Sequence, residues 1–359
     1  MKILLLGEFS GVHANLAKGL RFFGNEVLLA ADGDGYRNFE TDISINTNAL
    51  NLRTLREDFM HPIRHIEKFK GYDVVQLISP FIFNKKIPFY NNLLLRYLKK
   101  HNKKIFLISA GCGYKYNEGN KNLQYSPCSG CLEFDKKDSN CPYQKTYTKL
   151  IAHDVEGFVD GIIPLAYEYH YAYLNSEKNR NIISYPIDTD KLIYKENTVI
   201  NGAVSFFHGL NESRVGFKGT NTIKQAMENV KARYPSDVNI AFGGNLSFEE
   251  YTNLLSETNI VIDQSSSYCL AMNALNSMAM GKVVMGGAEP IAYQYLGSDI
   301  SIPAFNILPD VKDIERKMIQ IIDRKSEIEE IGLASRRFVE DHFNYKQVAT
   351  QFINTWAGN

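Results

Sequence analysis

The stretch IVIDQSSSYCLAMNALNSMAMGKVVM, residues 260–285, decides the fold class because it reads as one complete strand–helix–strand unit. Its two ends are short apolar runs. Between them a polar loop leads into a helical stretch whose stripe of Ala and Met is typical of core packing. Strands that are apolar throughout and alternate with helices belong to parallel sheets covered on both faces. The stretch therefore predicts a parallel α/β fold.

The same alternation occurs along most of the chain and restarts once, after the polar segment 181–198. We expect further strands at residues 2–6, 26–30, 73–78, 104–108, 161–165, 203–207 and 238–242, and helices at 14–23, 89–98, 167–174, 221–230, 271–280, 311–323, 326–341 and 345–356. The sequence therefore predicts an α/β fold of two Rossmann-like, doubly wound domains that face each other across a cleft. Ligands are expected at the carboxyl ends of the strands.

The composition is that of an ordinary globular protein: 359 residues, with 40 Lys and Arg against 40 Asp and Glu and 44% hydrophobic residues. Zero net charge removes the positive field with which proteins hold nucleic acid, so we expect no nucleic-acid partner. The first apolar run is too short for a signal peptide, and no run reaches the length of a membrane span. We therefore expect a cytoplasmic protein whose five cysteines are thiols or metal ligands.

The loop after the first predicted strand runs from Gly7 to His13 and leads into a helix. Gly11 lets backbone amides approach a ligand, and the helix N-terminus behind it favours an anion. The alternative is a tight turn between strand and helix. His13 at this helix start and His208 in the second half are the best-placed imidazoles for acid–base chemistry, with binding or structural roles as the alternative.

Two cations, Arg214 and Lys218, lie between a strand end and a helix start in the second half. Arg supplies a bidentate fork and Lys a point charge, a combination that suits a diphosphate; the alternative is two solvated loop charges. Further along, the backbone amides of Leu270, Ala271 and Met272 stand at another helix start, where they would stabilise an anion. Both elements predict a phosphate-binding surface.

Three motifs carry a resemblance to a known family. They are Gly11 before the first helix, Lys218-Gly219-Thr220 in the second half, and Ser277-Met278-Ala279-Met280-Gly281-Lys282 in the place of a Glu-Ala-Met-Ala-x-Gly-Lys signature. In this order and spacing they resemble the GT-B glycosyltransferases of the large retaining family 4, also called group 1. The resemblance covers nearly the whole chain.

This resemblance implies a division of labour along the chain. Residues 1–185 would form the acceptor domain, residues 186–340 would bind a UDP- or GDP-sugar donor, and a helix in residues 341–359 would return to the first domain. Gly11 would approach the donor diphosphate, and Arg214 and Lys218 would neutralise it, so that catalysis needs no metal or other cofactor.

The chain departs from the family at two glutamates that are spaced eight positions apart, for which it has Tyr268 and Asn276. Asn276 would hold a ribose or sugar hydroxyl, and Tyr268 would stack or hydrogen-bond without supplying negative charge. The resemblance implies transfer of a hexose-type sugar, with retention, to a saccharide or lipid-linked acceptor in surface polysaccharide assembly. The alternatives are a non-catalytic sugar-nucleotide-binding or scaffold protein that has lost the paired glutamates, and a sugar-nucleotide epimerase.

Four cysteines, Cys112, Cys128, Cys131 and Cys141, fall in a predicted insertion at residues 111–146. Clustered thiolates can hold a structural zinc ion tetrahedrally, which would fix the insertion and shape the acceptor side of the cleft. The alternatives are reduced thiols or a redox pair.

Basic side chains crowd residues 85–104, and no acidic residue interrupts them. The helix expected there could rest on anionic lipid at the inner face of the membrane, which would suit a lipid-linked acceptor. The alternative is a helix that covers the sheet and turns a solvated basic face outward.

Overall fold

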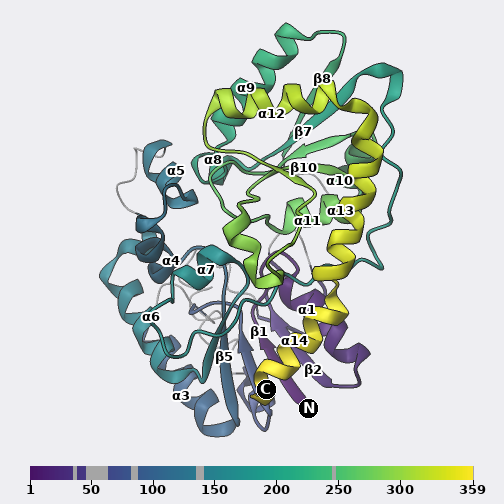
Figure 1. Ribbon diagram of the computed structural model, residues 1–359. Coiled ribbons are helices and arrows are strands. Elements are labelled where there is room, and N and C mark those ends of the chain that lie inside the picture. The colour runs from purple at the N-terminus through teal and green to yellow at the C-terminus, as the bar shows by residue number, and fades with distance from the viewer. Residues whose placement is uncertain (35–38, 46–63, 82–87, 135–140, 245–247, 359) are drawn as a thin grey trace. The chain divides into compact units, whose positions relative to one another are not determined.

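A computed structural model describes residues 1–34, 39–45, 64–81, 88–134, 141–244 and 248–358 of the chain (Figure 1). The chain folds into two compact units. The first consists of Met1–Gly119, Asn140–Pro186 and Tyr345–Asn359, and the second of Asn120–Ser139 and Ile187–Asn344.

The first unit is built on a parallel sheet of six described strands in the order β3-β2-β1-β4-β5-β6. The strands are β1 (Lys2–Leu6), β2 (Glu26–Ala31), β3 (Ile43–Ser44), β4 (Val74–Leu77), β5 (Lys104–Ser109) and β6 (Gly161–Pro164). The helices are α1 (Val12–Phe22), α3 (Pro88–His101), α4 (Tyr114–Gly119), α6 (Thr146–Phe158), α7 (Tyr167–Tyr171) and α14 (Tyr345–Ala357). The central strands are buried along their length, as expected of a sheet with helices on both faces.

The last helix belongs to this first unit, where α14 packs along α1 (Figure 1). The two backbones come so close at Gly19 that a Cβ there would lie 2.4 Å from the Tyr345 carbonyl oxygen. Buried Trp356 donates its indole N–H to Gln76 Oε1 at 3.0 Å, so a polar contact in the core also fixes α14 against β4.

The second unit is built on a parallel sheet of five described strands in the order β11-β10-β9-β7-β8. The strands are β7 (Val204–Leu210), β8 (Val238–Gly244), β9 (Ile260–Ile262), β10 (Val283–Gly286) and β11 (Ala304–Asn306). The helices are α5 (Pro127–Phe134), α8 (Val215–Lys218), α9 (Thr220–Arg233), α10 (Phe248–Ser256), α11 (Met272–Ala279), α12 (Val311–Asp323) and α13 (Ile328–His342).

The nine strands predicted from apolar runs are all present, and two short strands, β3 and β11, were not predicted. The division into units differs from the predicted one chiefly in the insertion, and residues 341–344, predicted with the last helix, also belong to the second unit. Residues 120–139, expected as part of an insertion in the first domain, cluster with the second unit. The reason is local packing, because α5 lies on α8.

Candidate functional site

In the first unit, the N-terminus of α1 is already occupied by a carboxylate of the protein itself. Glu8 Oε1 accepts the backbone N–H of Gly11 at 2.9 Å, and Oε2 accepts that of Ala14 at 2.7 Å. Glu8 is buried, and burial raises its pKa to about 7. Glu8 thus accepts two of the amides near which the sequence predicted a ligand diphosphate, and the role of Gly11 in binding that ligand stays a prediction.

His13 lies on the buried face of α1 and has no exposed surface. Its Nδ1 is 2.7 Å from the Gly7 carbonyl oxygen, and Nε2 is buried without a hydrogen-bond partner among the described residues. Burial lowers the pKa of His13 to about 4. The ring is neutral at pH 7, which leaves Nδ1 to donate to Gly7 and disfavours a role as general acid.

In the second unit, the carboxyl ends of β7, β9 and β10 gather polar side chains. Lys218 ends α8, and its Nζ lies 3.4 Å from Oδ1 of buried Asp263, which follows β9. Asn273 on α11 donates to the same oxygen at 3.1 Å. Asp263 Oδ2 and Ser265 Oγ are buried and have no hydrogen-bond partner in the described structure. These orphaned atoms mark a site with hydrogen-bonding capacity left over.

Gly219 makes this arrangement possible. It joins α8 to α9 with φ of +70°, and a Cβ on it would lie only 2.1 Å from Ser265 Oγ. The close approach also lets the Ser265 amide donate to the Lys218 carbonyl oxygen at 3.1 Å. A glycine at this position therefore holds the cation against the loop that follows β9.

The second predicted cation, Arg214, immediately precedes α8, one helical turn before Lys218. Its guanidinium lies 5.0 Å from the centre of the Phe217 ring, which supports the side chain by a cation–π contact. The two predicted cations thus lie at the two ends of α8, beyond the carboxyl end of β7.

His208 is part of the scaffold of this site. It is fully buried on β7, with Nδ1 2.7 Å from the Ile262 carbonyl oxygen and Nε2 3.1 Å from Thr220 Oγ1. Burial lowers its pKa to about 4. Both ring nitrogens are engaged inside the protein, so His208 ties β7 to β9 and to the start of α9 and has no nitrogen left for a ligand in this arrangement.

The start of α11 is only partly available as an anion site. The predicted Leu270 amide donates to the Tyr293 hydroxyl at 2.7 Å, whereas the amides of Ala271 and Met272 have no acceptor among the described residues. The N-cap residue of α11 contributes no side-chain hydrogen bond. Asn276 is half-buried on α11, one turn after Asn273.

Tyr268 stacks on a residue that sequence reasoning missed. Its ring centre lies 4.7 Å from that of Tyr125, at an interplanar angle of 28°. Tyr125 in turn donates its hydroxyl to Glu289 Oε1 at 2.6 Å. No spacing in the sequence links these residues. Asp263 and Glu8 both lie in loops after predicted strands. Nothing in the sequence indicates that Asp263 binds Lys218 or that Glu8 binds the α1 amides.

The four predicted zinc ligands are divided between the two units. All five cysteines lie in described parts of the chain, and none forms a disulfide. Cys112 and Cys141 belong to the first unit, whereas Cys128 and Cys131 lie on α5 in the second. No three His, Cys, Asp or Glu side chains among the described residues form a group that could hold a metal ion. The four-thiolate zinc site therefore stays a prediction.

Of the predicted basic stretch, Lys85 and Lys86 lie outside the described residues. Several of the others have partners within the first unit. Lys99 pairs with Asp160 at 2.6 Å and Lys103 with Asp73 at 2.7 Å, and Lys104 donates to the Trp356 carbonyl oxygen at 2.6 Å. These contacts agree with a helix that covers the sheet, and lipid contact stays a prediction. Within the described structure, no helix has the length and apolarity needed to cross a bilayer.

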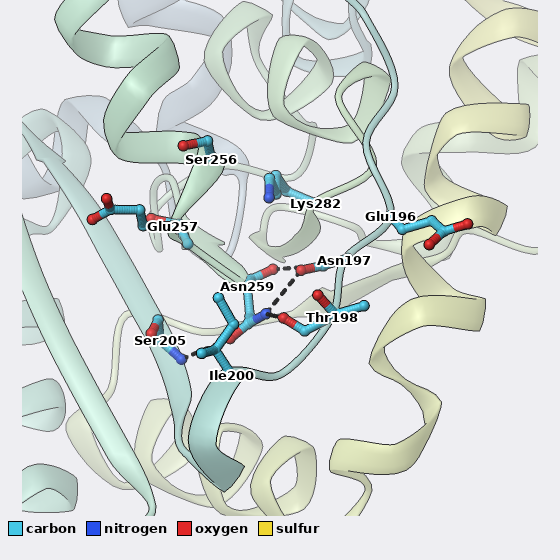
Figure 2. A pocket seen from close by; sticks show the side chains of 10 residues that line it. Glu196, Asn197, Thr198, Ile200, Ser205, Ser256, Glu257, Asn259 and Lys282 are labelled. Atoms are coloured by element: carbon cyan, nitrogen blue, oxygen red, sulfur yellow. Dashed lines mark hydrogen bonds between the residues drawn. The ribbon is translucent and has the colours of Figure 1, made fainter.

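Two small cavities lie away from Lys218 and Asp263. In the first unit, a pocket of about 20 Å³ lies beside Ser109 and Cys112, after β5. In the second unit, a cavity of about 40 Å³ lies at the amino ends of the strands, the edge opposite to Lys218. Figure 2 shows Lys282 there, with the carboxylates of Glu196 and Glu257 pointing away from it.

Comparisons with known proteins agree with this architecture. A profile of the family described as "Glycosyl transferase-like" matches residues 205–354. No curated protein sequence matches the chain. HepE of Anabaena, solved in complex with UDP and glucose, is similar with a TM-score of 0.61 at 11% identity, over 100% of both chains.

Two further solved structures share the fold. Sucrose-phosphate synthase from Thermosynechococcus elongatus has a TM-score of 0.63 at 15% identity, over 100% of this chain and 99% of that one. UDP-GlcNAc 2-epimerase from Neisseria meningitidis, bound to UDP-GlcNAc, has 0.55 at 11%, over 100% of both chains. Residues 205–354 thus match a family of glycosyl transferase-like sequences, and the chain shares its fold of two α/β units, each with a parallel sheet, with solved glycosyltransferase structures.

Proposed function

We propose that the protein is a glycosyltransferase that binds a nucleotide sugar on its second unit and transfers the sugar to a saccharide or lipid-linked acceptor. The observation that carries the proposal is the carboxyl edge of the second sheet. There Lys218, Arg214 and the uncapped starts of α9 and α11 lie within the glycosyl transferase-like segment. Cations and free helix amides at one sheet edge are suited to a diphosphate.

The chemistry follows from where charge develops. When the bond between the sugar and the diphosphate breaks, negative charge collects on the departing phosphate. Asp263 holds Lys218 at the proposed phosphate site, where the ammonium would offset this charge. The Arg214 guanidinium would add two parallel hydrogen bonds to phosphate oxygens. The two cations would take the place of a metal, so we expect a chelator to leave activity unchanged. Asn276 would bind a ribose or sugar hydroxyl.

The donor is proposed to be a UDP-sugar, with a GDP-sugar as the alternative, because HepE and the epimerase were solved with UDP or UDP-GlcNAc. Retention, a hexose-type sugar and a role in surface polysaccharide assembly rest on the family resemblance of the motifs. The cytoplasmic location and the inner membrane surface as a workplace are proposals of the same kind.

A binding titration tests the proposal. UDP, UDP-glucose, GDP and GDP-mannose are titrated into the wild type and into Lys218→Ala by calorimetry, with Lys224→Ala as the matched control. Lys224 is an exposed lysine on α9 that pairs with Glu228 at 3.8 Å. Loss of a charge-assisted contact of ~1.5–3 kcal/mol predicts about 10- to 100-fold weaker binding for Lys218→Ala only. Equal affinities in wild type and Lys218→Ala would remove the phosphate assignment.

A non-catalytic sugar-nucleotide binder is the second candidate, and it is favoured by Tyr268 and Asn276 standing where the family has glutamates. Turnover separates the two. A transferase releases UDP from UDP-glucose in the presence of an acceptor lipid or saccharide extract, and slowly by hydrolysis without one. A binder releases none while it still shows affinity. An epimerase would instead convert the sugar of UDP-GlcNAc with the nucleotide still attached.

A further inference from the structure

The segment Asn120–Ser139 is joined in sequence to the first unit on both sides, yet it packs in the second. Its helix α5 lies on α8, the short helix that ends at Lys218. At the crossing, a Cβ on Gly130 would lie 2.3 Å from the Gly216 carbonyl oxygen and 3.6 Å from Ser266 Oγ. Only glycine permits this approach, so the docking is specified by the sequence and places the segment beside the proposed phosphate site.

Tyr125 precedes α5 in this segment and is buried. Its ring stacks on Tyr268, and its hydroxyl donates to Glu289 Oε1 at 2.6 Å. Asn306 donates to the same oxygen at 2.8 Å and is itself fixed, because its Oδ1 accepts the Ala288 amide at 2.8 Å. Two donors from different elements therefore hold one oxygen of the Glu289 carboxylate.

The other oxygen of this carboxylate, Glu289 Oε2, has no donor among the described residues, and it is not sealed from solvent. Glu289 lies three residues beyond the carboxyl end of β10, and its amide donates to the Tyr268 carbonyl oxygen at 3.1 Å. The carboxylate is thus oriented at the ligand edge of the sheet with one acceptor unused. A buried or half-buried acceptor left over in this way fits a ligand donor such as a hydroxyl.

We propose that Tyr125, Tyr268 and Glu289 form a subsite for the sugar ring of the donor, in which Glu289 Oε2 accepts a sugar hydroxyl and the stacked tyrosines form an apolar wall. The proposal rests on the proposed function and adds the class of sugar. A carboxylate accepts from hydroxyls and repels a second carboxylate, so the subsite takes a neutral hexose and rejects a uronic acid. Tyr125 is a positioning residue, because it acts through Glu289.

The test compares three ligands that share one nucleotide: UDP, UDP-glucose and UDP-glucuronic acid, or the GDP-sugar equivalents if the protein binds guanosine. They are titrated into the wild type, Tyr125→Phe and Glu289→Gln. Tyr234→Phe, at the end of α9, is the matched control. Melting curves of all four proteins verify that they are folded.

For Tyr125→Phe, which keeps the ring and removes the hydroxyl, we expect UDP affinity within about twofold of the wild type and UDP-glucose affinity about five- to tenfold weaker. For Glu289→Gln, the preference for UDP-glucose over UDP-glucuronic acid falls about tenfold. Tyr234→Phe changes neither quantity.

The subsite is refuted if both variants weaken UDP and UDP-glucose equally, or if the preference against UDP-glucuronic acid survives in Glu289→Gln. A wild type that binds none of the nucleotides gives a different result: it refutes the proposed function, and the subsite with it. A wild type that binds UDP and UDP-glucose equally well refutes the subsite alone.

Discussion

Both units contain a helix that starts at the carboxyl end of a parallel sheet, but they differ in what accepts the hydrogen bonds of the first helix amides. In the first unit, the Glu8 carboxylate accepts the amides at the start of α1. In the second, the N-cap residues of α9 and α11 are Gly219 and Ala271, which contribute no side-chain bond, and buried Asp263 Oδ2 and Ser265 Oγ are left without partners. A carboxylate of the protein thus accepts two amides at the first helix start, whereas no described side chain is seen to cap the second.

This difference teaches that a Gly-rich turn before a helix is not by itself an anion site. An internal carboxylate can take the place of the ligand, and in a buried position it does so with a raised pKa rather than a full charge. The capacity to bind a phosphate is predicted by what is left unsatisfied. The free amides and the two cations are the reason why we propose the donor site in the second unit.

The largest expected effect on UDP binding comes from replacing one of two glycines, Gly219 or Gly11, with alanine. Gly219 and Gly11 both have positive φ, +70° and +86°, so Ala at either position strains the backbone by ~1–2 kcal/mol. At Gly219 the new Cβ would also overlap Ser265 Oγ and push Lys218 away from Asp263. We expect Gly219→Ala to weaken UDP binding about 100-fold and Gly11→Ala to leave it within about threefold. Calorimetric titration checks both, and similar losses in both variants would break the comparison.

The second prediction concerns the acid at α1. The folded-state pKa of Glu8 is raised to about 7 from 4.5, so the folded protein binds a proton more tightly than the unfolded chain. Protonated Glu8 therefore contributes to the free energy of unfolding in full below pH 4.5. About 2–3 kcal/mol of this contribution is lost as the pH rises to 7. In Glu8→Gln this loss disappears.

Thermal melts from pH 4.5 to 8 measure that loss as a difference between the wild type and Glu8→Gln. Glu26→Gln, which removes an exposed carboxylate, is the control and keeps the slope of the wild type. Parallel curves for Glu8→Gln and wild type would mean that Glu8 is not the acid that fills this helix start.

The sequence predicted the fold well because the central strands are apolar and buried along their length, a signal that needs no knowledge of their neighbours. It missed β3 and β11, since strands of two and three residues at sheet edges carry no periodicity. The helical bounds were correct to within a few residues where the apolar spacing was regular, as in Val311–Asp323.

The candidate site was predictable only in part. Arg214 and Lys218 were visible as cations between a strand and a helix, a purely local pattern. The partners that define the site come from elsewhere in the chain: Asp263 reaches Lys218 across 45 positions, and Tyr125 reaches Glu289 across 164. The docking of α5 depends on Gly130, whose missing side chain lets it approach the backbone of α8 at Gly216. Such pairs depend on tertiary packing, and a single sequence contains no sign of them.

The smallest expected effect lies at the opposite edge of the second sheet, where Lys282 is 2% exposed and its ammonium has no hydrogen bond or ion pair among the described residues (Figure 2). Burial, with the charge of Lys195, lowers the pKa of Lys282 to about 8. Its protonated form is therefore disfavoured in the fold, and stability rises as the pH increases from 8 to 10.5. Lys282→Met should stabilise the protein by about 1–2 kcal/mol at pH 7, less than the full shift because water in the cavity hydrates the ammonium. The advantage should vanish near pH 10.5 in chemical unfolding, and Lys195→Met should give a smaller gain. A destabilised Lys282→Met would mean that the ammonium has a favourable partner, and that this edge, like the opposite one, binds an anion.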